Sequence, residues 1–196
     1  MDDRVIRSMA RWPDVPAVFG WLALDARGRW LLKGETIANR AAVAFIARNY
    51  AHDELGRWYF QNGPQRVFVD LHATPWVFRL QAGGQLSNHI EQNVATVSSV
   101  FMDESGAVVL DTPAGAGLVD DRDLELFSRD LLAGNGAVLD EDTVAARVDL
   151  LASGESADLA VRITGALLPL GFLPERAMPS QFHFVREPRA REDETR

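Results

Sequence analysis

The sequence predicts an α+β fold of mainly antiparallel strands, arranged as two repeated hairpin-plus-helix units with helices packed on the sheets. The first observation is a recurring Asp-x-x-Gly pattern at 25–28, 53–56 and 103–106, flanked by short apolar segments. An Asp side chain can accept a hydrogen bond from the backbone two residues on, and Gly can take the positive φ that closes a hairpin. The second is a hydrophobic fraction of 47%, with five Trp and ten Phe, which supplies a core and argues against disorder.

The first hairpin-plus-helix repeat is predicted over residues 18–50. Residues 18–24 are apolar on both faces, as in a buried strand, and 29–32 return after the turn. Asn39 is a suitable N-cap for an amphipathic helix that ends near Tyr50. Three more strands are expected at 57–61, 66–71 and 76–80, since aromatic or alternating apolar residues occupy them.

The second unit is predicted to repeat this order from 97 to 132. Strands at 97–102 and 107–110 enclose a turn, a loop covers 113–117, and Asp120, Asp121 and Asp123 suit the positive end of a helix. A further helix is expected at about 141–151 and a last strand at 181–186. The match of 18–50 with 97–132 favours a duplication, with chance recurrence of common turns as the alternative.

These elements define the expected domain organisation. A lead-in spans 1–17, an N-terminal lobe 18–82, a polar connection 83–96, a C-terminal lobe 97–185 and a disordered tail 186–196. Residues 133–185 have no assigned role.

The chain resembles an uncharacterised bacterial family of domains of unknown function. The resemblance rests on the turn and Trp at 25–30, Gly34 to Ile37, the strand from Gly56 to Phe60, the alternating 67–71 segment and Pro75-Trp76-Val77. It covers about 18–132 in order. Thr36 stands where the family has Pro, and the first hairpin turn carries an extra residue. The resemblance implies a two-lobed α+β fold and a proposed part in signalling, and it supplies no catalytic residues.

Composition excludes several classes of function. The net charge is −8, which gives no electrostatic basis for non-specific nucleic-acid binding. Cysteine is absent, so disulfides, Cys-ligated metals and thiol nucleophiles are excluded. The sequence has no apolar run of membrane-spanning length, and we expect a cytoplasmic protein without membrane association.

No catalytic or metal motif is found. The four histidines, His52, His72, His89 and His183, lack the spacing of metal ligands, and no serine lies in a nucleophile elbow. The paired acidic residues lie in turns or at helix starts, where acids are structurally favoured. We therefore expect no catalytic residue, no metal and no cofactor.

An aromatic and arginine cluster is the candidate binding surface. If the strands pair, Tyr59 lies near Arg66 or Phe68, on a face that can bind an anion, an aromatic group or a peptide. The alternative is a solvated sheet face with ordinary cross-strand pairs. The ligand-binding candidates are Arg57, Tyr59, Arg66, Trp76 and Arg79.

The functional prediction is a non-enzymatic regulatory module that binds an unknown small molecule or protein. Two alternatives stay open: an enzyme with an unrecognised site in a cleft, and a purely structural interaction protein that forms a homodimer. A perturbed pKa beside a deep pocket would favour the enzyme, and a large exposed apolar patch the homodimer.

Overall fold

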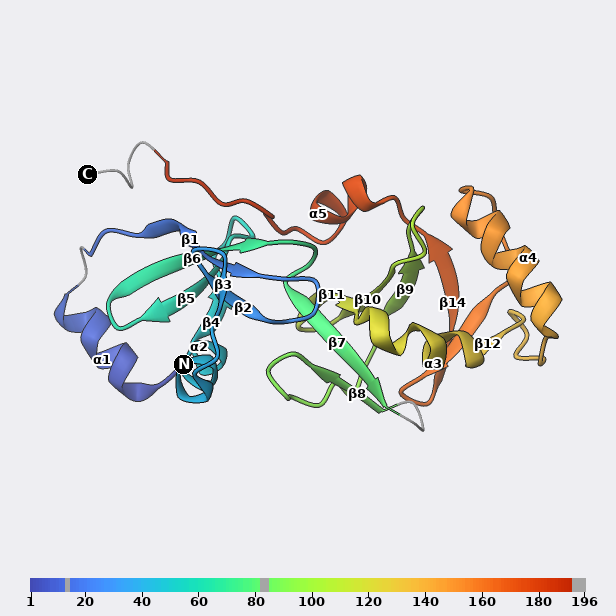
Figure 1. Cartoon of the computed structure of the whole chain (residues 1–196), viewed down its shortest axis with the longest axis horizontal. Helices are drawn as coiled ribbons and strands as arrows, with labels where there is room; N and C mark the ends of the chain where they lie inside the picture. Colours follow the sequence, from blue (N-terminus) through green and yellow to red (C-terminus); the bar gives the residue numbers. More distant parts are fainter. Residues whose placement is uncertain (13–14, 82–84, 192–196) are drawn as a thin grey trace. The chain divides into compact units, whose positions relative to one another are not determined.

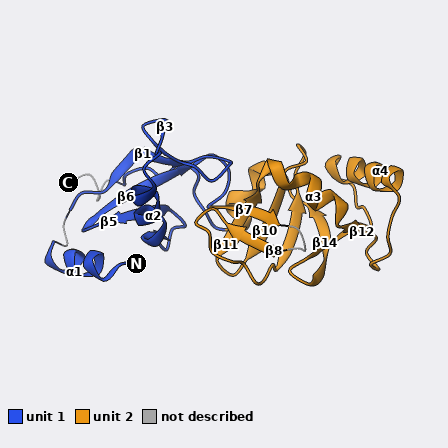
Figure 2. Cartoon of the chain, turned by 60° about the horizontal axis from the view of Figure 1, so that its bottom comes forward, with its two compact units in different colours: residues 1–75, 183–196 blue, residues 76–182 orange. Residues whose placement is uncertain are grey.

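The computed structural model describes residues 1–12, 15–81 and 85–191, which form two compact units (Figure 2). Unit 1 comprises Met1–Pro75 together with the chain from His183 onward, and unit 2 comprises Trp76–Phe182. This division differs from the expected boundaries, because the strand that begins at Trp76 pairs with a strand of unit 2. Unit 1 is therefore built from two separate stretches of chain.

The described residues of unit 1 contain a six-stranded sheet (Figure 1). Its strands are β1 (Val18–Leu24), β2 (Trp30–Leu32), β3 (Glu35–Thr36), β4 (Tyr50–His52), β5 (Trp58–Asn62) and β6 (Gln65–Leu71). They lie in the order β3-β2-β1-β6-β5-β4. The central strands β1 and β6 run parallel, and the other neighbours run antiparallel.

The described part of unit 1 also contains the helices α1 (Asp3–Arg11) and α2 (Arg40–Arg48). The Asn39 side chain accepts hydrogen bonds from the backbone of Ala41 and Ala42, as expected of an N-cap. Helix α2 places Phe45 edge-on against Phe60, with ring centroids 5.4 Å apart. This contact fixes α2 on the face of the sheet that carries the aromatic core.

In unit 2, the described residues form an eight-stranded sheet in the order β12-β13-β14-β9-β10-β11-β7-β8. Its strands are β7 (Trp76–Gln81), β8 (Gln85–Asn88), β9 (Ser99–Met102), β10 (Val108–Thr112), β11 (Gly115–Val119), β12 (Leu131–Leu132), β13 (Ala160–Ile163) and β14 (Ala166–Phe172). Strands β9 and β14 run parallel, as do β11 and β7.

The helical segments of unit 2 are η1 (Asp121–Asp123), α3 (Leu124–Arg129), α4 (Glu141–Ala152), η2 (Glu175–Ala177) and α5 (Met178–Gln181). The Asp120 side chain caps η1 and the Asp140 side chain caps α4, in each case by accepting a backbone N–H. The expected acidic helix start at 120–123 is thus present as a short 3-10 turn that continues into α3.

Over six strands, the two sheets follow the same order. Unit 1 has β3-β2-β1-β6-β5-β4 and unit 2 has β11-β10-β9-β14-β13-β12, with the parallel pair at the centre of both. The units differ outside this frame, because unit 2 adds β7 and β8 beyond β11 and inserts α4 between β12 and β13. The protein is a mixed α+β structure with two large, mostly antiparallel sheets.

Three expectations for local structure need correction. The connection 83–96 contains strand β8, although residues 82–84 lie outside the described part of the chain, and the loop 113–117 contains the start of β11. The last strand expected at 181–186 is instead the end of α5 and a turn, where His183 has a φ of 53°. Only Val185 makes a strand-like bridge there, to Arg57.

The expected disordered tail is partly ordered. Within the described residues 186–191, the Arg186 carbonyl accepts a hydrogen bond from the Leu71 N–H at 2.8 Å, and Pro188 is buried. Residues 192–196, which belong to the same expectation, lie outside the described part of the chain. Among the described helices, none has the length and apolar composition needed to cross a membrane.

Candidate functional site

The five sequence-predicted binding residues are divided between the units. Arg57, Tyr59 and Arg66 belong to unit 1, whereas Trp76 and Arg79 lie on β7 in unit 2. Each group therefore has its own structural environment.

In unit 1, the expected pairing of Tyr59 with its neighbours is present, but the face is not open. Tyr59 pairs with Phe68 across β5 and β6, and the Arg66 guanidinium lies 4.9 Å from the Tyr59 ring centroid. Tyr59 and Arg57 are each only 7% exposed. The Arg57 Nε donates to Asp53 Oδ2 at 2.7 Å and its guanidinium lies over Phe68 at 4.5 Å. Arg57 thus holds the 53–56 turn against the sheet, and Arg66 is the exposed member of the group.

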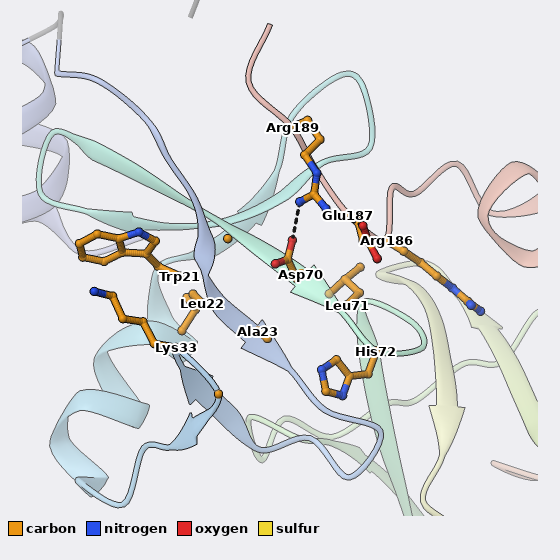
Figure 3. A pocket seen from close by; sticks show the side chains of 12 residues that line it. Trp21, Leu22, Ala23, Lys33, Asp70, Leu71, His72, Arg186, Glu187 and Arg189 are labelled. Carbon is orange, nitrogen blue, oxygen red and sulfur yellow. Dashed lines mark hydrogen bonds and ion pairs between the residues drawn. The ribbon is translucent and has the colours of Figure 1, made fainter. Parts of the chain in front are cut away.

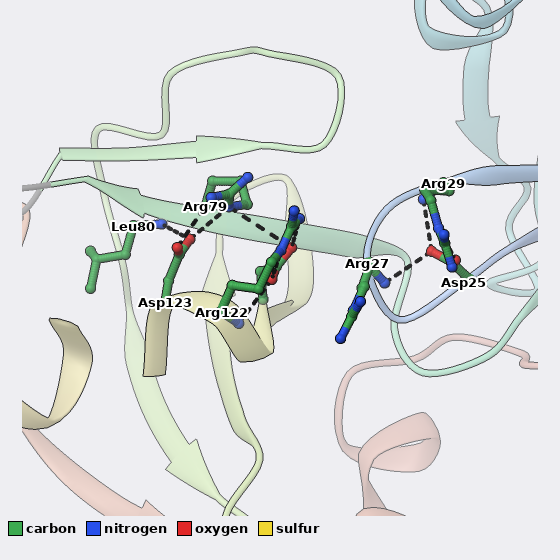
Figure 4. A network of polar contacts seen from close by, with 8 residues as sticks. Asp25, Arg27, Arg29, Arg79, Leu80, Arg122 and Asp123 are labelled. Atoms are coloured by element: carbon green, nitrogen blue, oxygen red, sulfur yellow. Dashed lines mark hydrogen bonds and ion pairs between the residues drawn. The ribbon is translucent and has the colours of Figure 1, made fainter. Parts of the chain in front are cut away.

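In unit 2, the candidate side chains make structural contacts. Trp76 is 7% exposed, and its Nε1 donates to the Ala114 carbonyl at 2.8 Å. Arg79 donates through Nε to Asp123 Oδ2 at 2.7 Å, and the Leu80 N–H donates to the same oxygen at 2.9 Å (Figure 4). These bonds attach η1 to strand β7.

The same network holds Asp120. Its side chain is 0% exposed, and both of its oxygens accept hydrogen bonds from the Arg122 guanidinium, at 2.8 and 2.5 Å. The Arg122 side-chain hydrogen bond lowers the pKa of Asp120 to about 2, more than burial raises it. Asp120 is consequently ionised at neutral pH, and its charge is compensated within the fold.

A cavity of about 690 Å³ lies on the sheet of unit 1, on the face of β1 and β6 that carries Ala23 and Asp70 (Figure 3). It exists because the wall contributed by β1 is small: Gly20 and Ala23 both line it. The register of β1 against β6 shifts between Val18 and Leu22, and Gly20 has a φ of 70°, which favours glycine. The bulge bends β1 at the cavity.

One side of the cavity carries an exposed aromatic ring and the only lysine of the chain. Trp21 is 51% exposed, and the Lys33 Nζ lies 3.9 Å from the centroid of its ring, which is cation–π contact. The Lys33 N–H donates to the Trp21 carbonyl at 2.7 Å, so the backbone holds the two residues together. Figure 3 shows the two side chains side by side.

The other side carries a carboxylate and the C-terminal segment. The Arg189 guanidinium lies 3.7 Å from Asp70 Oδ1 and 2.6 Å from Glu187 Oε2. Burial raises the pKa of Asp70, while the charge of Arg189 lowers it by a smaller amount. Arg186 and His72 complete this part of the lining.

Sequence reasoning did not find this cavity. Its residues come from three distant segments, and the C-terminal one was expected to be disordered. Two local signals were present: a single lysine and a Gly-Trp pair within an otherwise apolar strand. Among the described residues, no group of three or more His, Cys, Asp or Glu side chains is placed to hold a metal ion.

The model of a family named DUF2944, described as "Protein of unknown function (DUF2946)", matches residues 1–189. The chain belongs to this family. The expectation of an uncharacterised family is thereby confirmed. Among curated proteins, none matches the chain.

Two solved structures are similar to the chain. A DUF1285 family protein from Silicibacter pomeroyi DSS-3 is 15% identical, with a TM-score of 0.50 over 87% of this chain and 96% of that one. A DUF1285 family protein from Shewanella baltica OS155 is 16% identical, with a TM-score of 0.38 over 58% of this chain and 91% of that one. At this identity, the first likeness shows the fold alone.

Proposed function

We propose that the protein is a non-enzymatic regulatory module that binds a small molecule in the cavity of unit 1. The observation that carries the proposal is that unit 2 has the same strand frame but fills the matching place with a side chain. Ala23 pairs with Asp70 in unit 1, and Phe101 pairs with Gly171 in unit 2. The sheet of unit 1 therefore has a cavity at the position where the Phe101 ring packs in unit 2.

Equivalent backbone hydrogen bonds in the two units show which residues correspond. The His72 N–H donates to the Leu24 carbonyl at 3.0 Å, and the Leu173 N–H donates to the Met102 carbonyl at 3.0 Å. Leu24 precedes the Asp25 turn and Met102 precedes the Asp103 turn, so Ala23 corresponds to Phe101. In unit 2, the Phe101 ring packs against Gly171, and its Cδ1 lies 3.2 Å from the position that an ideal Cβ on Gly171 would take.

We further propose that the two units are copies of one hairpin-plus-helix element, one of which kept an open site. The shared order of six strands and the matching turns support this. So do the equivalent caps, since Asn39 begins α2 and Asp120 begins η1 at the same place in each order. The resemblance to a bacterial family and the cysteine-free sequence support action in a bacterial cytoplasm.

Native mass spectrometry of the full chain purified from its own host tests the proposed site. We expect a reproducible extra mass on the unaltered protein and its loss from Ala23→Phe, which places in unit 1 the side chain that fills unit 2. Ala146→Phe, on the exposed side of α4, is the matched control and should keep the mass.

Two outcomes would contradict the proposal. One is an extra mass that persists in Ala23→Phe, which would place the ligand elsewhere. The other is a bare protein that also gains no mass after incubation with a small-molecule extract of the host.

A further inference from the structure

Resting on the proposed function, we infer that the ligand is an anionic molecule with an aromatic ring, which stacks on Trp21, neutralises Lys33 and donates a hydrogen bond to Asp70. The three side chains line one cavity, and each recognises a different chemical group. Together they therefore restrict the class of ligand more than any one of them does alone.

Lys33 indicates that the ligand carries a negative charge. Its ammonium rests on the Trp21 ring, and no carboxylate of the described residues pairs with it. The backbone hydrogen bond between Lys33 and Trp21 fixes the base of the side chain. A charge already held in place loses less side-chain entropy when a counter-ion binds, which favours an acidic group at this end of the cavity.

The other charges of the lining lie close to one another. The Arg189 guanidinium lies 2.6 Å from Glu187 Oε2 and 3.7 Å from Asp70 Oδ1. Lys33 lies on the opposite side of the cavity from this group, beside Trp21. An acidic group of the ligand would therefore meet Lys33 at a place that neither acid of the lining occupies.

Asp70 indicates a hydrogen-bond donor on the ligand. Its Oδ1 is buried, with an Arg189 nitrogen 3.7 Å away, but the side chain as a whole lines the cavity and is 28% exposed. The accessible oxygen is therefore Oδ2. A ligand that displaces water from this oxygen without donating to it would leave an acceptor unpaired, which costs free energy, and a ligand N–H or O–H would avoid that cost.

Trp21 and the cavity volume limit the size of the ligand. An indole that is 51% exposed beside a cavity presents a flat apolar surface to a ring. The volume of about 690 Å³ lies within the range of roughly 300–1,000 Å³ that is typical of small-molecule sites. One or two fused rings with an acidic substituent fit these limits.

Two fluorescent probes test this class of ligand. The anionic probe 8-anilino-1-naphthalenesulfonate and its neutral analogue N-phenyl-1-naphthylamine share the fused rings and the N–H, and differ in the sulfonate. We titrate both into the full chain, into Lys33→Gln and into Asp70→Ala. Ala23→Phe tests the location, and Trp12→Ala is the control, since Trp12 is 58% exposed and lies outside the cavity.

We expect the anionic probe to bind the unaltered protein about threefold to tenfold more tightly than the neutral one, the effect of one partly exposed ion pair. Lys33→Gln should remove this difference. Asp70→Ala should weaken the neutral probe by about threefold to tenfold, because the N–H loses its acceptor. Ala23→Phe should weaken both probes, and Trp12→Ala neither.

The outcomes separate this inference from the proposed site. If both probes bind the unaltered protein equally and lose affinity in Ala23→Phe, the cavity is a site and the anionic class is wrong. If both probes bind Ala23→Phe as tightly as the unaltered protein, the site itself is wrong.

Discussion

The central parallel pair of strands is built in opposite ways in the two units. In unit 1, Ala23 and Asp70 leave a polar cavity, whereas in unit 2, Phe101 covers Gly171 and meets the Phe182 ring edge-on at 5.8 Å. The strand order and the central pairing are the same. The two units thus share a strand order and differ in the side chains at this pair of positions, and the following predictions test this comparison.

The turn glycines should show the largest difference between the units. Gly56 and Gly106 both have positive φ, 74° and 82°, but a Cβ on Gly56 would lie 2.1 Å from the His183 carbonyl oxygen, whereas Gly106 has open space. Gly106→Ala should cost about 1 kcal/mol of unfolding free energy from backbone strain alone. Gly56→Ala should cost at least about 3 kcal/mol. Urea unfolding measures both, and equal losses would contradict the packing of the C-terminal segment on this turn.

Opening unit 2 should cost stability without creating the site of unit 1. Phe101→Ala removes the ring that packs on Gly171 and Phe182, and we expect a loss of about 2–3 kcal/mol, below that of a fully buried Phe. The new space would have no counterpart of Asp70, so an anionic aromatic probe should gain no affinity. Thermal unfolding and the fluorescence titration check the two parts, and an unchanged melting temperature would refute the packing role.

The helix caps should respond differently to acid. Asp120 has a pKa of about 2 against an ordinary value of 3.8, so its ionised form stabilises unit 2 above pH 3.8, and this contribution is lost as pH falls from 3.8 to 2. Since Arg122 is half exposed, the contribution is about 1–2 kcal/mol after solvent screening. Asp120→Asn should remove it at neutral pH and flatten the acid dependence. A pH profile of unfolding that keeps its slope in the variant would contradict the assignment.

The uncharged cap of unit 1 should give the smallest effect. Asn39 is exposed and accepts the Ala41 N–H at 2.9 Å and the Ala42 N–H at 3.1 Å. Asn39→Ala should lower the unfolding free energy by about 1 kcal/mol, and equally at pH 3 and pH 7. Urea titrations at the two pH values measure this, with Asn39→Asp as the control that introduces acid dependence.

Signals that depend on neighbouring residues predicted most of the strands, helices and turns. Features that depend on contacts between distant parts of the chain were not predicted. The Asp-x-x-Gly turns, the Asn39 cap and the alternating Val67 to Leu71 strand all depend on neighbours within a few residues. No strand was predicted over residues 166–172, where Pro169 interrupts the apolar residues, yet β14 lies there and Pro169 pairs with Ala160 in the sheet. The cavity could not be predicted, since Trp21, Asp70 and Arg189 meet only after the C-terminal segment returns to β6.

The division of unit 1 into two stretches has a consequence for synthesis on the ribosome. The Leu71 N–H finds its acceptor, the Arg186 carbonyl, only after every residue of unit 2 has been translated. At roughly 5–20 residues per second, that interval is on the order of ten seconds. During it, the nascent chain exposes the end of β6 and an unfinished cavity wall, while unit 2 already has all of its strands once Phe172 emerges. Unit 1, whose first stretch is synthesised before unit 2, is therefore completed after it.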